Sequence, residues 1–311
     1  MAEGLELLGK ALAAYWTAPL PLAILAVCGA SMATLLYVFV TNGRNPRLRV
    51  SLLTGFYALT MFFWLFVGVS LLLCVWQARS VAYRTSGVQI AAAGAVLAAL
   101  AATIVISALV WRFAPAAVLR RFPLRGPEPG EAWTQSYADL LAEFEGLPRT
   151  RIAIVDSDAP VGMAVGGSAP TVLLSRGLLG ALDRDEAETV IAHELMHIKH
   201  HDAGFKVFSR VLSRVLFFDP FSKFFDPAVH REREYLADEA GGRTTGKPAA
   251  LASALLKIAD RGPTPRAAWG LSILGPAKGV FSRYPPVRER VRRLLLLSTL
   301  LEGAPRTPAK P

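Results

Sequence analysis

The sequence predicts a mainly α-helical protein with a small β-sheet, in which membrane-spanning helices come first and a water-exposed domain follows. Three observations predict this architecture. Long uncharged apolar runs fill the first third of the chain, charged residues are concentrated after residue 112, and short apolar segments between glycines and prolines indicate a few strands. With 53% apolar and 19% charged residues, the chain is too hydrophobic for an ordinary soluble enzyme.

The three apolar runs cover residues 17–40, 50–76 and 88–111 and contain 24, 27 and 24 residues. Each is long enough, as a helix, to cross a hydrocarbon core of about 30 Å. Aromatic residues that prefer the membrane interface stand at their ends, namely Tyr15, Trp16, Trp76 and Trp111. We therefore expect a membrane domain at residues 1–112 with three spans. The first run should stay uncleaved, because Glu3 and Glu6 precede it in place of a basic cluster.

Basic residues in the short loops predict which side of the bilayer each loop faces. The first loop holds Arg44, Arg47 and Arg49, and the stretch after the third run holds Arg112, Arg120, Arg121 and Arg125. The opposite side has Lys10, Arg79 and Arg84. Since basic loops stay in the cytoplasm, we expect a multi-pass protein of the cell (inner) membrane with its N-terminus outside and its C-terminal domain in the cytoplasm.

The formal net charge of +10 does not indicate a nucleic-acid partner, because the chain holds no motif of a nucleic-acid-binding fold. Many arginines flank apolar segments, so an anionic lipid surface is the partner that this charge favours. Only Cys28 and Cys74 occur, both inside apolar runs, and they predict neither a disulfide framework nor a cysteine-ligated metal.

The sequence Ala192-His193-Glu194-Leu195-Met196-His197 is the strongest chemical motif of the chain. On a helix, His193 and His197 lie one turn apart on one side, so both rings can turn a nitrogen toward one cation. This HExxH pattern is typical of zinc sites in which the glutamate is the general base acting on water. The helix is expected independently, because Asp183 and Glu186 form a capping-box pattern ahead of an apolar stripe.

A third ligand is expected about one helix further along the chain. Asp226-Pro227 resembles a helix start, after which Glu234 and Asp238 lie one turn apart on one face. Glu234 can complete a site with His193 and His197, leaving the fourth position to water. Asp238 can accept the second ring N–H of a ligand histidine and fix its tautomer.

These segments resemble the HtpX and CAAX prenyl protease family of membrane-embedded zinc metallopeptidases, and the HtpX branch is the more similar. The likeness covers roughly residues 150–295 and rests on His193–His197, Glu234–Asp238, Pro248–Leu256 and Phe281–Arg290. It implies a gluzincin-type, zincin-like peptidase domain with one zinc ion per chain. Two departures occur: Gly162-Met163-Ala164-Val165 replaces an Asn-Ala-Phe-Ala-like stretch, and Arg283-Tyr284-Pro285-Pro286 replaces Thr-His-Pro-Pro. Tyr284 is therefore a candidate hydrogen-bond donor to the transition state.

The remaining segments complete the predicted domain. Prolines and glycines predict a linker at residues 113–132, then the peptidase domain at 133–300 and a flexible tail at 301–311. Helices are expected at residues 133–146, 249–260 and 287–301, and strands at 151–155 and 171–175. Gly162, Gly166 and Gly167 indicate a bent or bulged segment between the strands. An exposed strand edge could receive an extended substrate, with a purely structural hairpin as the alternative.

Residues 205–218 combine one apolar stripe with a basic stripe of Lys206, Arg210 and Arg214. A fourth span is disfavoured, because burying three cations would cost about 8–10 kcal/mol against a gain of about 4 kcal/mol from the apolar side chains. A basic amphipathic helix on the cytoplasmic membrane surface and a helix buried in the domain both remain open. His200, His201 and Asp202 are expected to be solvated residues at the helix end rather than ligands.

The sequence therefore predicts a membrane-bound zinc endopeptidase whose base is Glu194 and whose polypeptide substrates, by resemblance, are misfolded or damaged membrane proteins. Three alternatives are a ligand-sensing signalling peptidase that cleaves a regulator, a CAAX-type processing enzyme and a zinc scaffold without turnover. The intact Glu194 disfavours the scaffold, because a structural site needs no base. Substrate specificity, self-cleavage and oligomeric state are left open.

Overall fold

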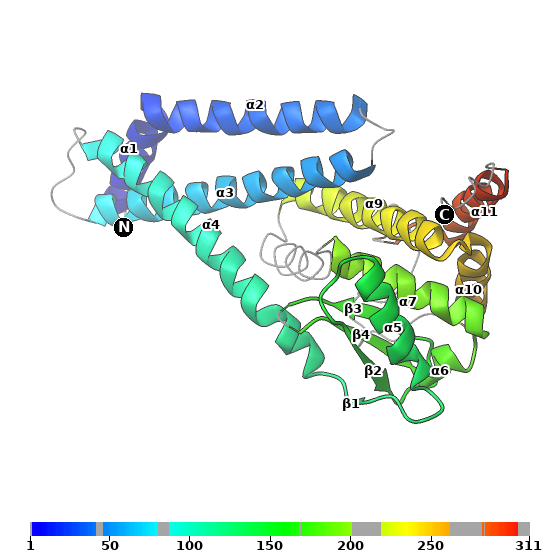
Figure 1. Cartoon of the computed structure of the whole chain (residues 1–311). Helices are drawn as coiled ribbons and strands as arrows, with labels where there is room; N and C mark the ends of the chain where they lie inside the picture. Colours follow the sequence, from blue (N-terminus) through cyan, green and yellow to red (C-terminus); the bar gives the residue numbers. More distant parts are fainter. Residues whose placement is uncertain are drawn as a thin grey trace. The chain divides into compact units, whose positions relative to one another are not determined.

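The computed structural model describes residues 2–41, 46–79, 87–167, 169–200, 219–261, 282 and 284–303. The chain divides into two compact units, Met1–Leu109 and Val110–Pro311. Helices dominate both, and the second unit also contains a small mixed sheet (Figure 1). The predicted fold class, mainly α with a small β-sheet, is confirmed.

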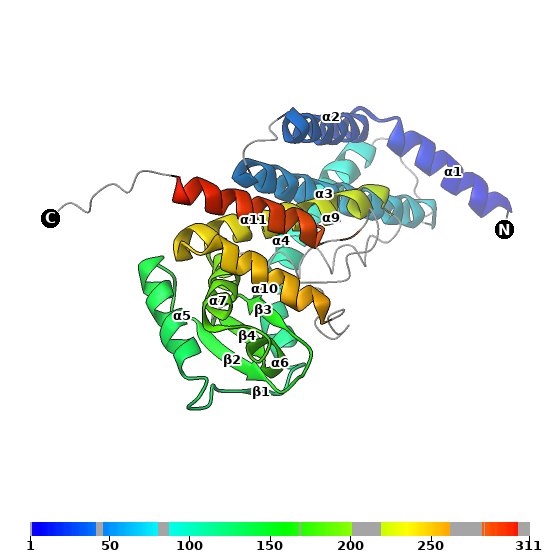
Figure 2. The same ribbon diagram turned by 90° about the vertical axis from the view of Figure 1, so that its right-hand side faces the viewer.

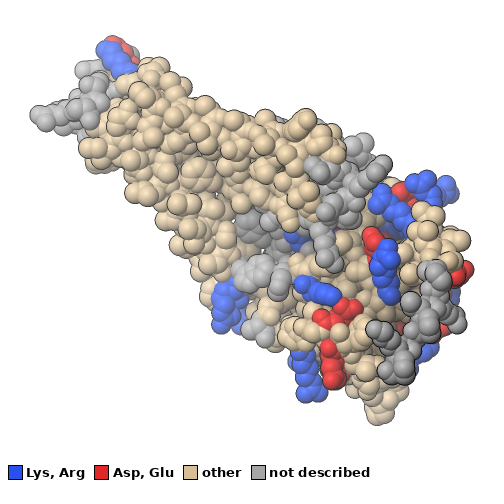
Figure 3. Space-filling view, turned by 45° about the horizontal axis from the view of Figure 1, so that its top comes forward, with Lys and Arg blue, Asp and Glu red and all other residues tan. Residues whose placement is uncertain are grey.

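The first unit is formed by helices that match the three apolar runs. These are α2 (Pro19–Thr41), α3 (Pro46–Arg79) and α4 (Val88–Leu119), the last of which continues into the second unit. All three are long and apolar enough to cross a membrane. Their outer faces carry exposed apolar side chains such as Leu72 and Ile90. In Figure 3 the surface of these helices is almost wholly tan, while most blue and red side chains lie on the second unit.

A further helix, α1 (Ala2–Trp16), precedes the spans and was not expected from the sequence. It packs on α3, where the Tyr15 hydroxyl lies 2.8 Å from the Ser70 hydroxyl. Tyr15 is fully buried and packs against Cys74 of α3 and Val88 of α4. Cys28 and Cys74 are both buried and free.

Helix α4 runs past its predicted end at residue 111 to Leu119, with Pro115 inside it. Its last turns belong to the second unit, where Val118 packs on Met163 and Val165 of the sheet. The segment that the sequence assigned to a linker, residues 113–132, therefore contains the end of α4 and the short strand β1 (Leu124–Arg125). The composition of residues 113–132 could not predict this contact, because the strands that α4 packs on come later in the sequence.

The sheet has the strand order β1-β2-β4-β3. The predicted strands are β2 (Arg151–Val155) and β4 (Thr171–Ser175), which run parallel, and β1 is antiparallel to β2. Between them, Gly162–Val165 forms the regular edge strand β3, antiparallel to β4, and the predicted bend follows it at Gly167, which has φ +114°. Close packing explains the glycine: a Cβ on Gly162 would lie 3.3 Å from Leu178 Cδ2.

Helices cover one face of this sheet and the end of α4 covers the other. Alternate residues separate the faces, as a strand period of two requires. Ile152, Ile154, Val172 and Leu174 contribute to the helix-covered core, whereas Met163, Val165 and Leu173 contact the α4 side. The helices that contact the strands are α5 (Trp133–Phe144), α6 (Arg176–Leu179) and α7 (Arg184–Lys199). Beyond them, α9 (Pro220–Thr245) and α10 (Pro248–Asp260) pack on α7, and α11 (Val287–Glu302) packs on α9 and α10. Figure 2 shows α10 and α11 side by side above α7.

The predicted start of α9 at Asp226-Pro227 is wrong. The helix begins at Pro220, directly after Asp219, and Pro227 lies inside it. The chain carries the same Asp-Pro pair twice, at Asp219-Pro220 and Asp226-Pro227, so the local start signal was ambiguous. The predicted amphipathic segment 205–218 lies outside the described residues, as do His201, Asp202 and the end of the tail.

Candidate metal centre

Helix α7 carries the two histidines and the glutamate of the HExxH motif inside the second unit. The predicted capping box is present: Asp183 accepts a hydrogen bond from the Glu186 backbone N–H, and the Glu186 carboxylate accepts one from the Asp183 N–H. His193, Glu194 and His197 are at most 1% exposed. The helix therefore holds all three motif side chains away from bulk water.

Helix α9 approaches α7 closely at a glycine. A Cβ on Gly241 would lie 3.2 Å from both the backbone nitrogen and the Cα of His193. This close approach lets side chains one and two turns earlier on α9 reach the motif. Glu234 and Asp238 point at the α7 histidines from there, and both carboxylates are buried.

Three donor atoms converge between α7 and α9. The Nε2 atoms of His193 and His197 lie 3.2 Å apart, and the Glu234 carboxylate oxygens lie 3.6 Å from His193 Nε2 and 3.5 Å from His197 Nε2. Ligand atoms held about 2.0–2.2 Å from a tetrahedral zinc ion are about 3.3–3.6 Å apart. The group of His193, His197 and Glu234 can therefore bind a metal ion, and its spacing fits zinc.

Asp238 lies behind His193, on the side away from the converging nitrogens. Its Oδ1 is 3.0 Å from His193 Nδ1. Burial alone would lower the pKa of His193, but the hydrogen bonds to Asp238 and Glu234 outweigh it and raise that pKa to about 9. Burial alone would raise the pKa of Asp238, but the charge of Arg290 and the hydrogen bonds from Arg290 and His193 lower it. A carboxylate here fixes His193 with Nδ1–H as donor and Nε2 facing the other two ligands.

Arg290 of α11 is the residue of this site to which the sequence analysis gave no role. It is fully buried, and its Nε and Nη2 donate to the two Asp238 oxygens at 2.7 and 2.6 Å. In the sequence it is one of four arginines between residues 288 and 293, with nothing to distinguish it from its exposed neighbours. Its helical spacing to Leu294 and Leu297, both buried, was the available signal.

The edge strand β3 runs beside the motif glutamate. A Cβ on Gly162 would lie 3.7 Å from Glu194 Oε1, so the first residue of the strand is adjacent to the carboxylate. β3 pairs with β4 on one side and stands at the end of the strand order. A peptide bound along the other side would pass next to Glu194.

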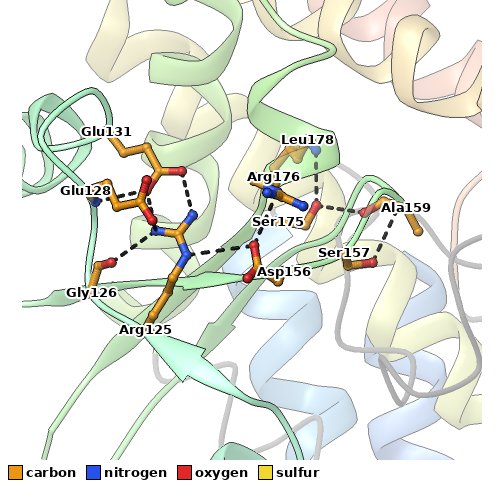
Figure 4. A network of polar contacts seen from close by, with 10 residues as sticks. All are labelled: Arg125, Gly126, Glu128, Glu131, Asp156, Ser157, Ala159, Ser175, Arg176 and Leu178. Atoms are coloured by element: carbon orange, nitrogen blue, oxygen red, sulfur yellow. Dashed lines mark hydrogen bonds and ion pairs between the residues drawn. The ribbon is translucent and has the colours of Figure 1, made fainter.

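A buried hydroxyl fixes the chain that enters β3. The Ser175 hydroxyl accepts a hydrogen bond from the Leu178 backbone N–H and donates one to the Ala159 carbonyl (Figure 4). It also accepts one from the Val161 backbone N–H. In the same network Asp156 lies 3.2 Å from Arg176 and 3.8 Å from Arg125, whose guanidinium also donates to Glu131. These contacts tie β1 and the loop after β2 to the start of α6.

Tyr284 and His200, the other candidates from the sequence, are not part of the group formed by His193, His197 and Glu234. Tyr284 is 5% exposed and lies shortly before α11, where its backbone N–H donates to the Ser282 hydroxyl. Its function as a transition-state donor stays a prediction. His200 is the C-cap of α7, and its backbone N–H donates to the Met196 carbonyl.

The chain is similar to known peptidases. A family model described as BlaR1 peptidase M56 matches residues 77–271, more than half of the chain. The "Protease HtpX homolog" of Pyrococcus abyssi is 32% identical over 257 residues, which cover 67% of this chain and 88% of the relative. The homolog of Pyrococcus furiosus is 34% identical over 203 residues, covering 50% and 70%. The crystal structure of S. mikatae Ste24p has a TM-score of 0.40 at 16% identity, covering 89% and 99%.

Both the family model and the relatives name peptidases, and three helices of this chain are able to span a membrane. The protein is therefore an integral membrane protease that acts on polypeptides. The chain belongs to the membrane metallopeptidase family that the HtpX homologs and the M56 peptidases represent.

Proposed function

We propose that this protein is a zinc-dependent endopeptidase that hydrolyses peptide bonds of misfolded or damaged membrane proteins at the cytoplasmic face of the inner membrane. The observation that carries the proposal is the convergence of His193, His197 and Glu234 next to a glutamate and an edge strand. In this assignment the three residues are the ligands, Glu194 is the base and Asp238 orients His193.

The donor set supports zinc over harder cations. Two imidazole nitrogens and one carboxylate oxygen form the ligand set of catalytic zinc sites, whereas magnesium and calcium prefer oxygen ligands. Three protein ligands leave one coordination position for water or substrate. A zinc ion, when bound here, would supply a Lewis acid that polarises the scissile carbonyl and acidifies water.

Glu194 follows a ligand histidine on α7, so its carboxylate is held at the site by the same helix. In the proposed reaction, its carboxylate takes the proton of the attacking water. It then gives the proton to the nitrogen of the departing amine, so that base and acid are one group. Burial of Glu194 to 1% exposure strengthens these electrostatic effects, because little bulk water competes with them.

The substrate would bind as an extended strand along β3. Backbone groups on the outer side of an edge strand can pair with another chain, which positions a peptide without regard to its sequence. Such binding suits a protease whose substrates share unfolded backbone rather than one motif. Gly162 leaves space beside Glu194, since it has no side chain to occupy it.

A second candidate function is a signalling peptidase that cleaves a regulator when a ligand binds outside the cell. The observation that favours it is the family model described as BlaR1 peptidase, which matches residues 77–271 and so includes all of α4. The two functions differ in substrate range. A quality-control protease would cleave many unfolded membrane proteins, whereas a signalling enzyme would cleave one folded regulator only when triggered.

The test compares the purified wild type with Glu194→Gln, and with Glu239→Gln as a control on the exposed side of α9. Bound zinc is measured by elemental analysis, and cleavage is followed with an unfolded membrane protein in detergent. We expect equal zinc in all three proteins, cleavage by the wild type and the control, and a loss of at least 100-fold in Glu194→Gln. Equal cleavage by Glu194→Gln, or a wild type that binds no zinc, would contradict the proposal.

A further inference from the structure

Arg290 is a fully buried cation that the proposed reaction does not use. It lies in the first turn of α11, and its interaction with Asp238 joins residues 52 positions apart in the sequence. A buried guanidinium loses its hydration, so it persists only where carboxylates compensate it. Among the described residues, the carboxylates of Glu234 and Asp238 lie within ion-pair distance of it.

We propose that Arg290 is a positioning residue of the metal centre, which sets the orientation of His193 through Asp238 and the orientation of Glu234 directly. This inference rests on the proposed function, because it concerns how the zinc ligands of that site are held. It predicts that α11, at the far end of the chain, is required for metal affinity and not only for the stability of the fold.

The first contact fixes Asp238. Arg290 Nε donates to Asp238 Oδ2 at 2.7 Å and Nη2 donates to Oδ1 at 2.6 Å, so the planar fork of the guanidinium matches the carboxylate. The same Oδ1 lies 3.0 Å from His193 Nδ1. Rotation of the carboxylate would therefore break a bond to Arg290 before it released His193. The imidazole plane, and with it the direction of Nε2, is set from α11.

The second contact reaches a ligand. Arg290 Nη1 lies 3.4 Å from Glu234 Oε2, the oxygen that is 3.6 Å from His193 Nε2. Glu234 and Asp238 are like charges one turn apart on α9, and both are buried, so they repel each other. One guanidinium between them offsets this repulsion and holds both on the α7 side. A lysine ammonium is a point charge and cannot make the bidentate contact and the contact with Glu234 together.

The backbone of α11 gives Arg290 a firm base. Leu294, one turn further on, belongs to the core shared with α7 and α10, and Leu297, two turns further on, is also buried. Gly242 of α9 allows this packing, because a Cβ there would lie 3.2 Å from Leu297 Cδ2. Because α11 is held by this packing, Arg290 is held in place and fixes the positions of the two α9 carboxylates.

The experiment uses the full-length protein in detergent, four single variants and one double variant: Arg290→Gln, Arg290→Lys, Asp238→Asn, Arg292→Gln and Asp238→Asn/Arg290→Gln. Arg292 is the matched control, because it lies on the same helix with a side chain 78% exposed. Zinc affinity is measured by competition with a chelator, and the visible spectrum of the cobalt-substituted protein reports ligand geometry. Circular dichroism and thermal unfolding confirm that each variant is folded, and kcat and KM are measured at saturating zinc.

We expect Arg290→Gln to weaken zinc binding 10- to 100-fold and to change the cobalt spectrum, with kcat falling more than KM rises. Arg290→Lys should recover part of the affinity, and Arg292→Gln should behave as the wild type. If Arg290→Gln does not fold, Arg290→Lys and the double variant Asp238→Asn/Arg290→Gln decide. In the Asp238→Asn background, loss of Arg290 should weaken zinc binding much less than in the wild type.

Wild-type zinc affinity and an unchanged cobalt spectrum in a folded Arg290→Gln protein would overturn this inference and leave the proposed function intact. Full additivity of the Asp238 and Arg290 substitutions would do the same. If the wild type itself bound no zinc, the proposed function would fail and this inference with it, so the two failures are distinguishable.

Discussion

At the scale of single residues, several carboxylates of the second unit that are buried or half-buried have partners on other elements. Asp238 meets Arg290, and Glu186, which is 3% exposed, accepts from Ser253 at 2.6 Å and Lys257 at 2.6 Å. Glu145, just after α5, accepts from Thr244 of α9 at 2.6 Å and pairs with Lys199 at the end of α7. Each partner offsets the cost of removing a charge from water.

The Glu145 contacts predict a pH-dependent contribution to stability. Burial raises the pKa of Glu145, but hydrogen bonds from Lys199 and Thr244 outweigh it and hold that pKa below its ordinary value of 4.5. A lowered folded-state pKa gives stability that is present above about pH 4.5 and lost as the pH falls through the folded-state value. We expect Glu145→Gln to lower the unfolding midpoint by about 1–3 °C at pH 7.

The difference between wild type and Glu145→Gln should shrink as the pH is lowered below 4.5, because protonation removes the same charge from the wild type. Differential scanning fluorimetry of the detergent-solubilised proteins at pH 7, 5 and 4 measures it. A difference that stayed constant with pH would mean that the carboxylate charge of Glu145 contributes nothing.

At the scale of elements, the metal centre depends on how closely α9 can approach α7. Gly241 permits contact with the His193 backbone, and Glu234 and Asp238 reach the α7 histidines because the helices are this close. Helix pairs with ordinary side chains at their contact are about 8–10 Å apart, so a small residue is needed for a closer approach. The pair Gly241-Gly242 lowers the helix propensity of α9, but it allows the neighbouring helices to pack closely against it.

We expect Gly241→Ala to destabilise the protein by about 1–3 kcal/mol, since an added methyl group at 3.2 Å from backbone atoms forces the two helices apart. The displacement moves Glu234 away from the histidines, so zinc affinity should fall at least tenfold. Urea unfolding and chelator competition measure the two effects. Gly130→Ala is the control, because a Cβ there meets no atom within 4 Å. Unchanged zinc affinity in Gly241→Ala would show that the site tolerates a wider helix pair.

At the scale of the whole molecule, one helix, α4, contains the third apolar run and also packs on the sheet of the second unit. α4 begins in the membrane unit, and its last turns cover the sheet face opposite α7, where Val118 packs against β3 residues. Gly167, at φ +114°, follows β3, and a Cβ there would lie 3.1 Å from Pro115. The strand proposed to bind substrate is therefore packed on one side by α4 and lies next to Glu194 on the other.

Val118→Asp is expected to abolish cleavage or to raise KM strongly, because a charge would be buried between α4 and the sheet. Ala117→Asp is the matched control, one residue away on the exposed side of the same helix. Zinc affinity should change much less than cleavage, since the ligands lie on α7 and α9. Peptidase assays and chelator competition on both variants test this, and normal cleavage by Val118→Asp would exclude a contribution of α4 to β3.

The sequence by itself determined the features that depend on neighbours along the chain. Apolar runs of 24 to 27 residues define the spans, the pair Asp183 and Glu186 defines the start of α7, and helical spacing places His193 beside His197. It also indicated Glu234 and Asp238, because an i, i+4 pair of acids on a helix is a local pattern. Two strands and three helices of the second unit were predicted for the same reason.

Only the tertiary structure decided what meets across the chain. It placed Arg290 on Asp238, the end of α4 on the sheet, and β3 beside Glu194, and it moved the start of α9 to Pro220. These contacts join residues far apart in sequence, and no periodicity records them. In the sequence, Arg290 is one of four nearby arginines and would be expected to be solvated. It is buried against two carboxylates because its environment is set by helix packing and not by its neighbours in sequence.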